Sequence, residues 1–130
     1  MSDKNLSILV QYRFQRAMDT IPEIELLLAN KFWNTAVNRM YYASFYAVGA
    51  LLIKHNLLTA THSGTKQLLG QHFVNTGLIS KAGGRHFTRL FEKRQKGDYD
   101  DFFDNDEPST TALWEPTKAF IEEIRILLNL

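Results

Sequence analysis

The sequence predicts an all-α fold, most simply an antiparallel bundle of four to five helices, formed by a single domain over residues 1–130. Apolar residues recur every three or four positions over long windows, as they do on one face of a helix. No window shows the sustained apolar and polar alternation that is typical of a strand. A chain of 130 residues with 45% hydrophobic content can also bury one core without a disulfide or a structural metal.

The first expected helix covers about residues 6–28, with a break near its middle. Thr20 can cap a new helix, Pro22 suits a first helical turn, and Glu23 follows Thr20 by three residues, as in a capping box. The sequence therefore predicts a kink or a restart at this point.

The second expected helix covers about residues 32–55 and carries the clearest pattern. Its polar or aromatic side still holds Tyr42, Phe45 and Tyr46, so the helix should lie between neighbours on nearly all sides. The apolar or small residues of the other side are Val37, Met40, Ser44, Ala47, Val48 and Leu51.

Three further helices complete the predicted bundle. A short third helix is indicated over residues 65–73 and a fourth over residues 87–91, where apolar residues again recur at helical spacing. A long C-terminal helix follows over residues 113–128. Ser109 or Thr110 can cap this last helix, and Pro116 requires an irregular start because proline fits only the first turn.

Composition excludes several classes of protein. Without cysteine there is no disulfide framework, thiolate metal site or cysteine nucleophile, and this usage suits a reducing cytoplasm, where we expect the protein to act. We expect no signal peptide and no membrane span, because the longest apolar stretch, residues 41–53, is shorter than the ~20 residues a span needs. No two of the four histidines lie three or four residues apart, so we expect no metal site and no cofactor.

The charged residues outline a candidate binding site. Arg39 lies in the aromatic second helix and requires a partner, either an internal ion pair or a phosphate or nucleotide, because an unpaired buried charge is costly. Asp98 is the expected partner of Arg39. It would instead pair with Arg94 if the fourth helix continued through Gly97.

The histidines receive separate interpretations. His62 lies where a loop enters the third helix, and capping or a surface position is favoured there over catalysis. His72 is expected on the inner face of the third helix. His86, beside Arg85 and Arg89, is a candidate for a basic RNA-binding patch.

Several segments together resemble a HEPN domain, in particular the short stand-alone prokaryotic kind that is often encoded beside a minimal nucleotidyltransferase. The resemblance covers nearly the whole chain. It rests on Tyr12-Arg13-Phe14-Gln15-Arg16-Ala17, on the segment from Ala36 to Tyr46, on Thr61-His62-Ser63-Gly64, on Phe73-Val74-Asn75-Thr76-Gly77 and on Arg94-x-x-x-Asp98-Tyr99.

This resemblance implies a helical homodimer with a role in toxin–antitoxin or defence systems and in RNA or nucleotide binding. Many HEPN proteins are metal-independent ribonucleases that use an arginine and a histidine four to six residues later, at the dimer interface. This chain departs from that pattern, because Tyr99, Asp100 and Asp101 occupy those positions after Arg94. The departure argues against an efficient ribonuclease.

The leading hypothesis is therefore a binding and interaction protein, a homodimer that engages a nucleotidyltransferase partner, RNA or a nucleotide. One alternative is a divergent metal-independent endoribonuclease in which Arg94 works with a distant histidine such as His62, because Asp98 is too weak a base and Tyr99 is mostly protonated at neutral pH. Another is a degenerate structural subunit. The residues proposed to bind are Arg39, Tyr42, Arg94, Asp98 and Tyr99.

Overall fold

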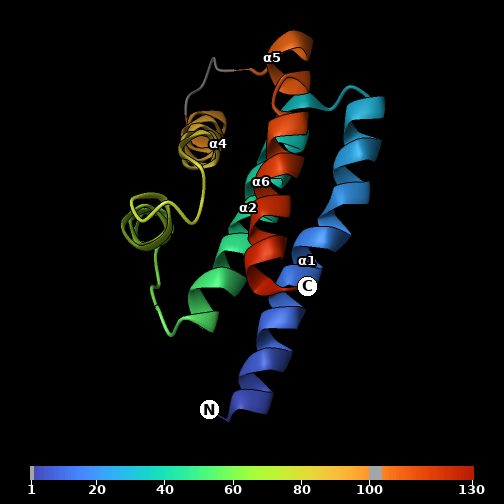
Figure 1. Ribbon diagram of the computed structural model, residues 1–130. Coiled ribbons are helices and arrows are strands. Elements are labelled where there is room, and N and C mark those ends of the chain that lie inside the picture. The colour runs from blue at the N-terminus through green and yellow to red at the C-terminus, as the bar shows by residue number, and fades with distance from the viewer. Residues whose placement is uncertain (1, 100–103) are drawn as a thin grey trace.

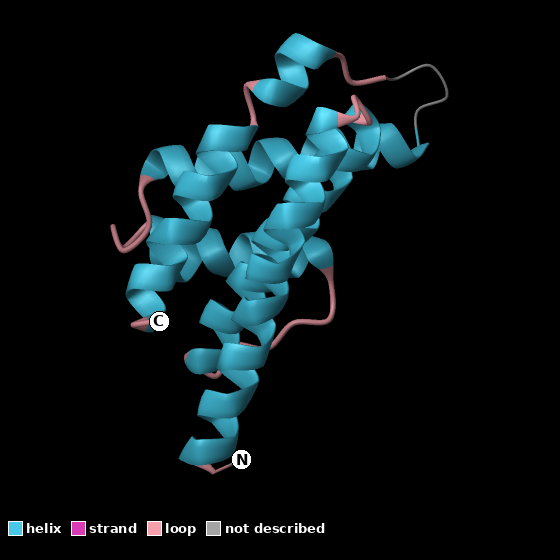
Figure 2. Ribbon diagram, turned by 90° about the vertical axis from the view of Figure 1, so that its right-hand side faces the viewer, coloured by secondary structure: helices cyan, strands magenta, loops and turns pink. Residues whose placement is uncertain are grey.

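The computed structural model describes residues 2–99 and 104–130, except for the side chains at positions 98 and 99, and within these ranges it is all-α (Figures 1 and 2). The fold-class prediction is thereby confirmed. Figure 1 shows α1, α2 and α6 side by side, whereas α4 is seen end-on and so runs across them. The elements are α1 (Asp3–Ala29), α2 (Trp33–Lys54), α3 (His62–Leu69), the π-helical turn η1 (Gly70–Val74), α4 (Lys81–Tyr99), α5 (Glu107–Thr111) and α6 (Trp114–Leu128).

Helix α2 is the centre of the fold, as its pattern predicted. It contacts α1, α3, α4, α5 and α6. Its side chains are buried on more than one face, from Ala36 near its start to Ile53 near its end. The aromatic ring of Phe87 from α4 stacks between Tyr41 of α2, at 5.7 Å between ring centres, and Phe120 of α6, at 5.6 Å. These three rings join the helices that surround the core.

The predicted restart in the first helix is wrong, because α1 continues through Pro22. The Thr20 hydroxyl does not cap a new helix but donates to the carbonyl oxygen of Arg16 at 2.7 Å. An interior proline costs roughly 3 kcal/mol. Burial of Val10, Phe14 and Ile24, each contributing about 1.5–3 kcal/mol, outweighs that cost. Ala17 and Thr20 of α1 are buried as well.

The predicted cap of the last helix is also wrong. Asp106 caps the separate short helix α5, accepting a hydrogen bond from the Ser109 amide at 2.9 Å. The Ser109 hydroxyl in turn accepts from the Asp106 amide, which completes a capping box. Helix α6 begins after Leu113 and has Pro116 in its first turn, which is the part of a helix that tolerates proline.

Two of the histidines lie where the sequence did not place them. His86 is only 3% exposed and its Nε2 lies 2.8 Å from the hydroxyl oxygen of Thr117, so it is not part of a basic surface patch. The register of α4 turns His86 and Phe87 inward and leaves Arg85 and Arg89 exposed. His72, expected in the core, is exposed on η1, where Phe73 instead points inward. Within the described ranges, no helix has the length and apolar character of a membrane span.

Candidate functional site

Four polar side chains from three helices meet beside the middle of α2. The hydroxyl of Tyr41 lies 2.7 Å from Nδ1 of His62, and Nη1 of Arg94 donates to the hydroxyl of Tyr42 at 3.2 Å. The guanidinium carbon of Arg94 lies 5.1 Å from the centre of the Tyr41 ring and 5.8 Å from that of the Tyr42 ring. We call Tyr41, Tyr42, His62 and Arg94 the Tyr–His–Arg cluster.

The start of α3 positions the imidazole. The hydroxyl of Thr61 accepts from the amide of Gly64 at 2.9 Å, which makes Thr61 the cap and His62 the first helical residue. A side chain at Gly64 would overlap the hydroxyls of Thr59 and Thr61, so a larger residue there would force these hydroxyls, including the capping one, to move. The His62 ring then stacks on Phe45, with ring centres 4.6 Å apart, and its Nδ1 meets Tyr41.

The electrostatics of the cluster favour neutral rings around one cation. Partial burial, and then the positive charge of Arg94, lower the pKa of His62, so its imidazole is neutral at pH 7. Burial raises the pKa of Tyr41 to about 12, although Arg94 acts in the opposite direction. A phenol with this pKa keeps its proton and can both donate to and accept from an imidazole nitrogen.

This arrangement corrects the interpretation of His62. The sequence favoured capping or a surface position, and it offered no histidine four to six residues after Arg94 to act in a pocket around that side chain. The structure instead gives the cap to Thr61 and places a half-buried imidazole in the pocket. A search for histidine shortly after arginine could not find this residue, because Tyr41 and His62 are 21 positions apart and Arg94 lies on a third element.

Arg39 lies at the edge of the cluster and forms an ion pair with a carboxylate from α1. Its guanidinium carbon is 5.9 Å from the Tyr42 ring centre, and its Nη2 lies 3.7 Å from a carboxylate oxygen of Glu23 on α1. The ion pair is partly exposed rather than internal, with 29% of the Arg39 side chain accessible. The predicted pairing of Asp98 with Arg39 or Arg94, and the predicted role of Tyr99, lie outside the described side chains.

A polar hollow of about 300 Å³ opens next to Arg94, between the start of α2 and the end of α4. The carbonyl oxygen of the Asn34 side chain accepts from the backbone amide of Asn105 at 2.7 Å, which ties the start of α2 to the segment that precedes α5. Amide, hydroxyl and cationic groups line the hollow, and these are the donors that phosphate oxygens accept. Its lining residues include Asn34, Thr35, Asn38, Lys93, Arg94 and Asn105.

Metal ligands do not gather in the described part of the chain. Among residues 2–99 and 104–130, side chains at 98 and 99 apart, no three histidine, aspartate or glutamate residues form a group able to hold a metal ion.

Comparisons with known proteins agree with this fold. The model of the HEPN domain family matches residues 10–127. A UPF0332 protein of Thermotoga maritima is 34% identical over 121 residues, which cover 93% of this chain and 92% of the relative. A protein of Methanocaldococcus jannaschii named "Putative toxin MJ0605" is 30% identical over 127 residues, covering 98% of this chain and 94% of the relative. The chain belongs to the HEPN domain family.

Proposed function

We propose that this protein is the toxin-like member of a toxin–antitoxin or defence pair and that it cleaves RNA with His62 and Arg94. The observation that carries the proposal is a neutral imidazole, held at 2.7 Å by Tyr41, in the same cluster as the Arg94 guanidinium. The relative named as a toxin, which aligns along almost all of this chain, supports the toxin-like role.

The chemistry follows from these groups. When His62 donates through Nδ1 to the Tyr41 oxygen, Nε2 carries the lone pair that accepts the proton of an RNA 2′-hydroxyl. The 2′-oxygen then attacks the adjacent phosphorus, the bond from phosphorus to the 5′-oxygen breaks, and the 5′-oxygen takes a proton from solvent water, giving a 2′,3′-cyclic phosphate and a free 5′-hydroxyl, while His62 returns its proton to solvent. The Arg94 guanidinium stabilises the negative charge that develops on the phosphate oxygens during the attack.

We also propose an oligomeric state, a partner and a location for this protein. A homodimer would bring two copies of the cluster to one shared cleft, as in the ribonucleases that this chain resembles. A nucleotidyltransferase would be the partner that controls the toxin, and both would act in the cytoplasm, where the RNA substrate is made.

The test is incubation of the purified protein with structured RNA in EDTA, followed by separation of the products. Cleavage by the wild type should fall about 100-fold or more in H62N, the order expected when a general base is lost. R94Q should fall by a similar factor because it removes the stabilising cation. H72N is the matched control, since His72 is exposed on η1, and it should cleave like the wild type.

A binding module is the second candidate, and one observation favours it. His62 and Arg94 each already bond to a tyrosine hydroxyl, so the cluster is tied together without a substrate. In that case RNA or a nucleotide would bind through Arg39, Tyr42 and Arg94 and would not be cleaved. Arg94-dependent binding with intact RNA would therefore support the module over the enzyme.

A structural subunit is the third outcome. If Arg94 serves only to join α4 to α2, R94A should lower the melting temperature while RNA and partner affinities stay the same. Measuring stability and RNA binding on the same R94A preparation distinguishes this outcome from the other two.

A further inference from the structure

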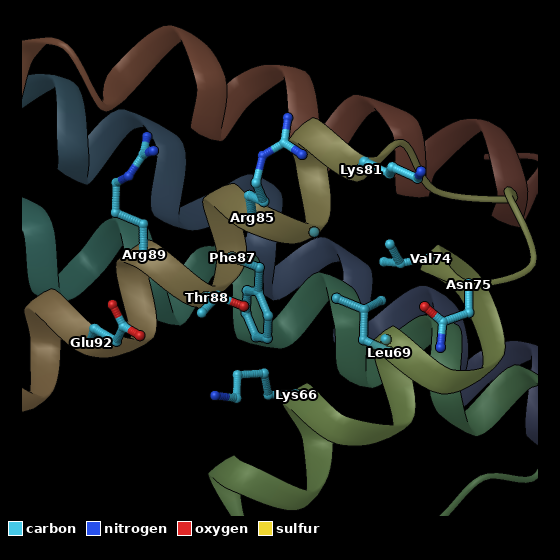
Figure 3. A pocket seen from close by; sticks show the side chains of 12 residues that line it. Lys66, Leu69, Val74, Asn75, Lys81, Arg85, Phe87, Thr88, Arg89 and Glu92 are labelled. Carbon is cyan, nitrogen blue, oxygen red and sulfur yellow. The ribbon is translucent and has the colours of Figure 1, made fainter.

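A second hollow, rich in basic residues, shares no lining residue with the polar hollow beside Arg94. It is an open groove of about 800 Å³ between α3, η1 and α4, which we call the α3–α4 groove (Figure 3). Figure 3 shows the Phe87 ring pointing from α4 toward α3, with Lys66 on the α3 side. Lys81, Arg85 and Arg89 stand on the α4 side. The Tyr–His–Arg cluster contributes no lining residue to this groove.

The charge of the groove is strongly one-sided. Lys66, Lys81, Arg85 and Arg89 line it, against a single carboxylate from Glu92. The whole chain has a formal net charge of only +1. A local excess of cations on a nearly neutral protein is the electrostatic footprint of an anionic partner.

The spacing of the cations suits a linear polyanion. Lys81, Arg85 and Arg89 follow one another by four residues along α4 and are all exposed. Their backbone positions therefore rise by roughly 6 Å each along one helix face. This is of the same order as the separation of successive phosphates in an extended nucleic acid strand.

The floor of the groove admits a close approach. Leu69 and Val74 offer apolar surface, and no atom lies within 4 Å of where a side chain would begin at Gly70. Gly70 also begins η1, and π-helical turns of this kind occur often at functional sites. A backbone without side chains at this point lets a strand lie against the protein.

The groove lies close to the Tyr–His–Arg cluster along α3. Lys66 lines the groove and follows His62 by one helical turn on α3. Its amine lies 4.8 Å above the centre of the Phe91 ring, which in turn meets the Tyr41 ring at 6.1 Å. A strand bound beside Lys66 would therefore lie one helical turn of α3 from His62.

We propose that the α3–α4 groove binds the sugar–phosphate backbone of single-stranded RNA through Lys66, Lys81, Arg85 and Arg89 and leads the strand to the Tyr–His–Arg cluster. This inference rests on the proposed function and adds a separate substrate-holding surface to it. Glu92 opposes the phosphates at the end nearest the cluster. Removal of its charge should strengthen binding.

The experiment measures binding of a fluorescein-labelled single-stranded RNA by fluorescence anisotropy over a range of salt concentrations, with full-length protein in EDTA. The test variant is R85Q/R89Q. The control, K4Q/K31Q, removes the same charge from two exposed lysines outside the groove. If both arginines contact phosphates, the slope of log affinity against log salt should become shallower by about 1.4. Affinity at low salt should fall by about 10- to 100-fold.

The outcomes separate the inference from the proposed function. The inference is supported if R85Q/R89Q loses affinity and slope, K4Q/K31Q does not, and E92Q binds more tightly. It is overturned if the two double variants behave alike or if the wild type does not bind RNA. It is also overturned if polyglutamate of equal charge displaces the RNA as well as unlabelled RNA does, because the groove would then fit an acidic protein. If R85Q/R89Q binds RNA as tightly as the wild type, and cleavage is still lost in H62N, the inference about the groove fails and the proposed function is kept.

Discussion

Acidification should destabilise this protein through His86, because the folded state holds that imidazole in its neutral form. The Thr117 hydroxyl donates to the carbonyl oxygen of Leu113 at 2.7 Å, so its oxygen must accept from Nε2–H of His86 at 2.8 Å. Nδ1 of His86 is buried and has no hydrogen-bond partner in the described part of the chain. A proton added there would place an unpaired charge in the core.

The size of the effect follows from the pKa of His86. Burial, and then the charge of Arg89, lower it from 6.5 to about 4. As the pH falls below 6.5, the unfolded chain takes up a proton that the folded chain refuses, so stability decreases until the pH reaches about 4. The difference amounts to about 1.4 kcal/mol at pH 5.5 and about 2.5 kcal/mol at pH 4.5.

Urea unfolding at several pH values measures this loss. H86Q is the comparison, because its amide can still donate to Thr117 but does not titrate. The free energy of unfolding of the wild type should fall more steeply than that of H86Q between about pH 6.5 and pH 4.5. NMR titration of the His86 ring provides a direct check. Parallel pH dependence in the two proteins, or a ring that titrates at pH 6 or above, would refute the reasoning.

Two further predictions concern stability. F120A should lower the free energy of unfolding in urea by about 3–5 kcal/mol, because Phe120 is 1% exposed and stacks on Phe87. The control I126A, at a site that is 60% exposed, should change it by no more than about 0.5 kcal/mol. Equal losses in the two variants would contradict the described core. G70A should raise stability by about 0.4–1 kcal/mol, because Gly70 has helical dihedral angles and open space at its β position. G77A should lower stability by at least about 1 kcal/mol, because Gly77 has a φ of +83°. Melting temperatures that moved in the same direction in both glycine variants would exclude this account.

Much of the fold could be predicted from local pattern. The apolar repeat of α2 predicted both its central place and its bounds, because a helix that is apolar on most sides must be covered on most sides. The break expected at Pro22 failed for a related reason. Local capping signals compete with burial against a neighbouring helix, and the contacts of α1 with α2 are not visible in the residues around Thr20.

The candidate site, like the fold, could be predicted from the sequence only in part. Arg94 and Tyr42 were identified from the types of residue and their places on helices, and the structure joins them by a hydrogen bond of 3.2 Å. The place of His62 beside Tyr41 could not be predicted, because the two residues are 21 positions apart and no fixed spacing in the sequence links them.

What the sequence determined by itself is therefore the all-α class, the central aromatic helix and the supply of cations. The tertiary structure alone decided which histidine meets Arg94, which one is sealed in the core beside Thr117, and which cations share one groove. The physical reason is that periodicity reports which face of a helix is buried, whereas the meeting of side chains from different helices depends on how those helices cross.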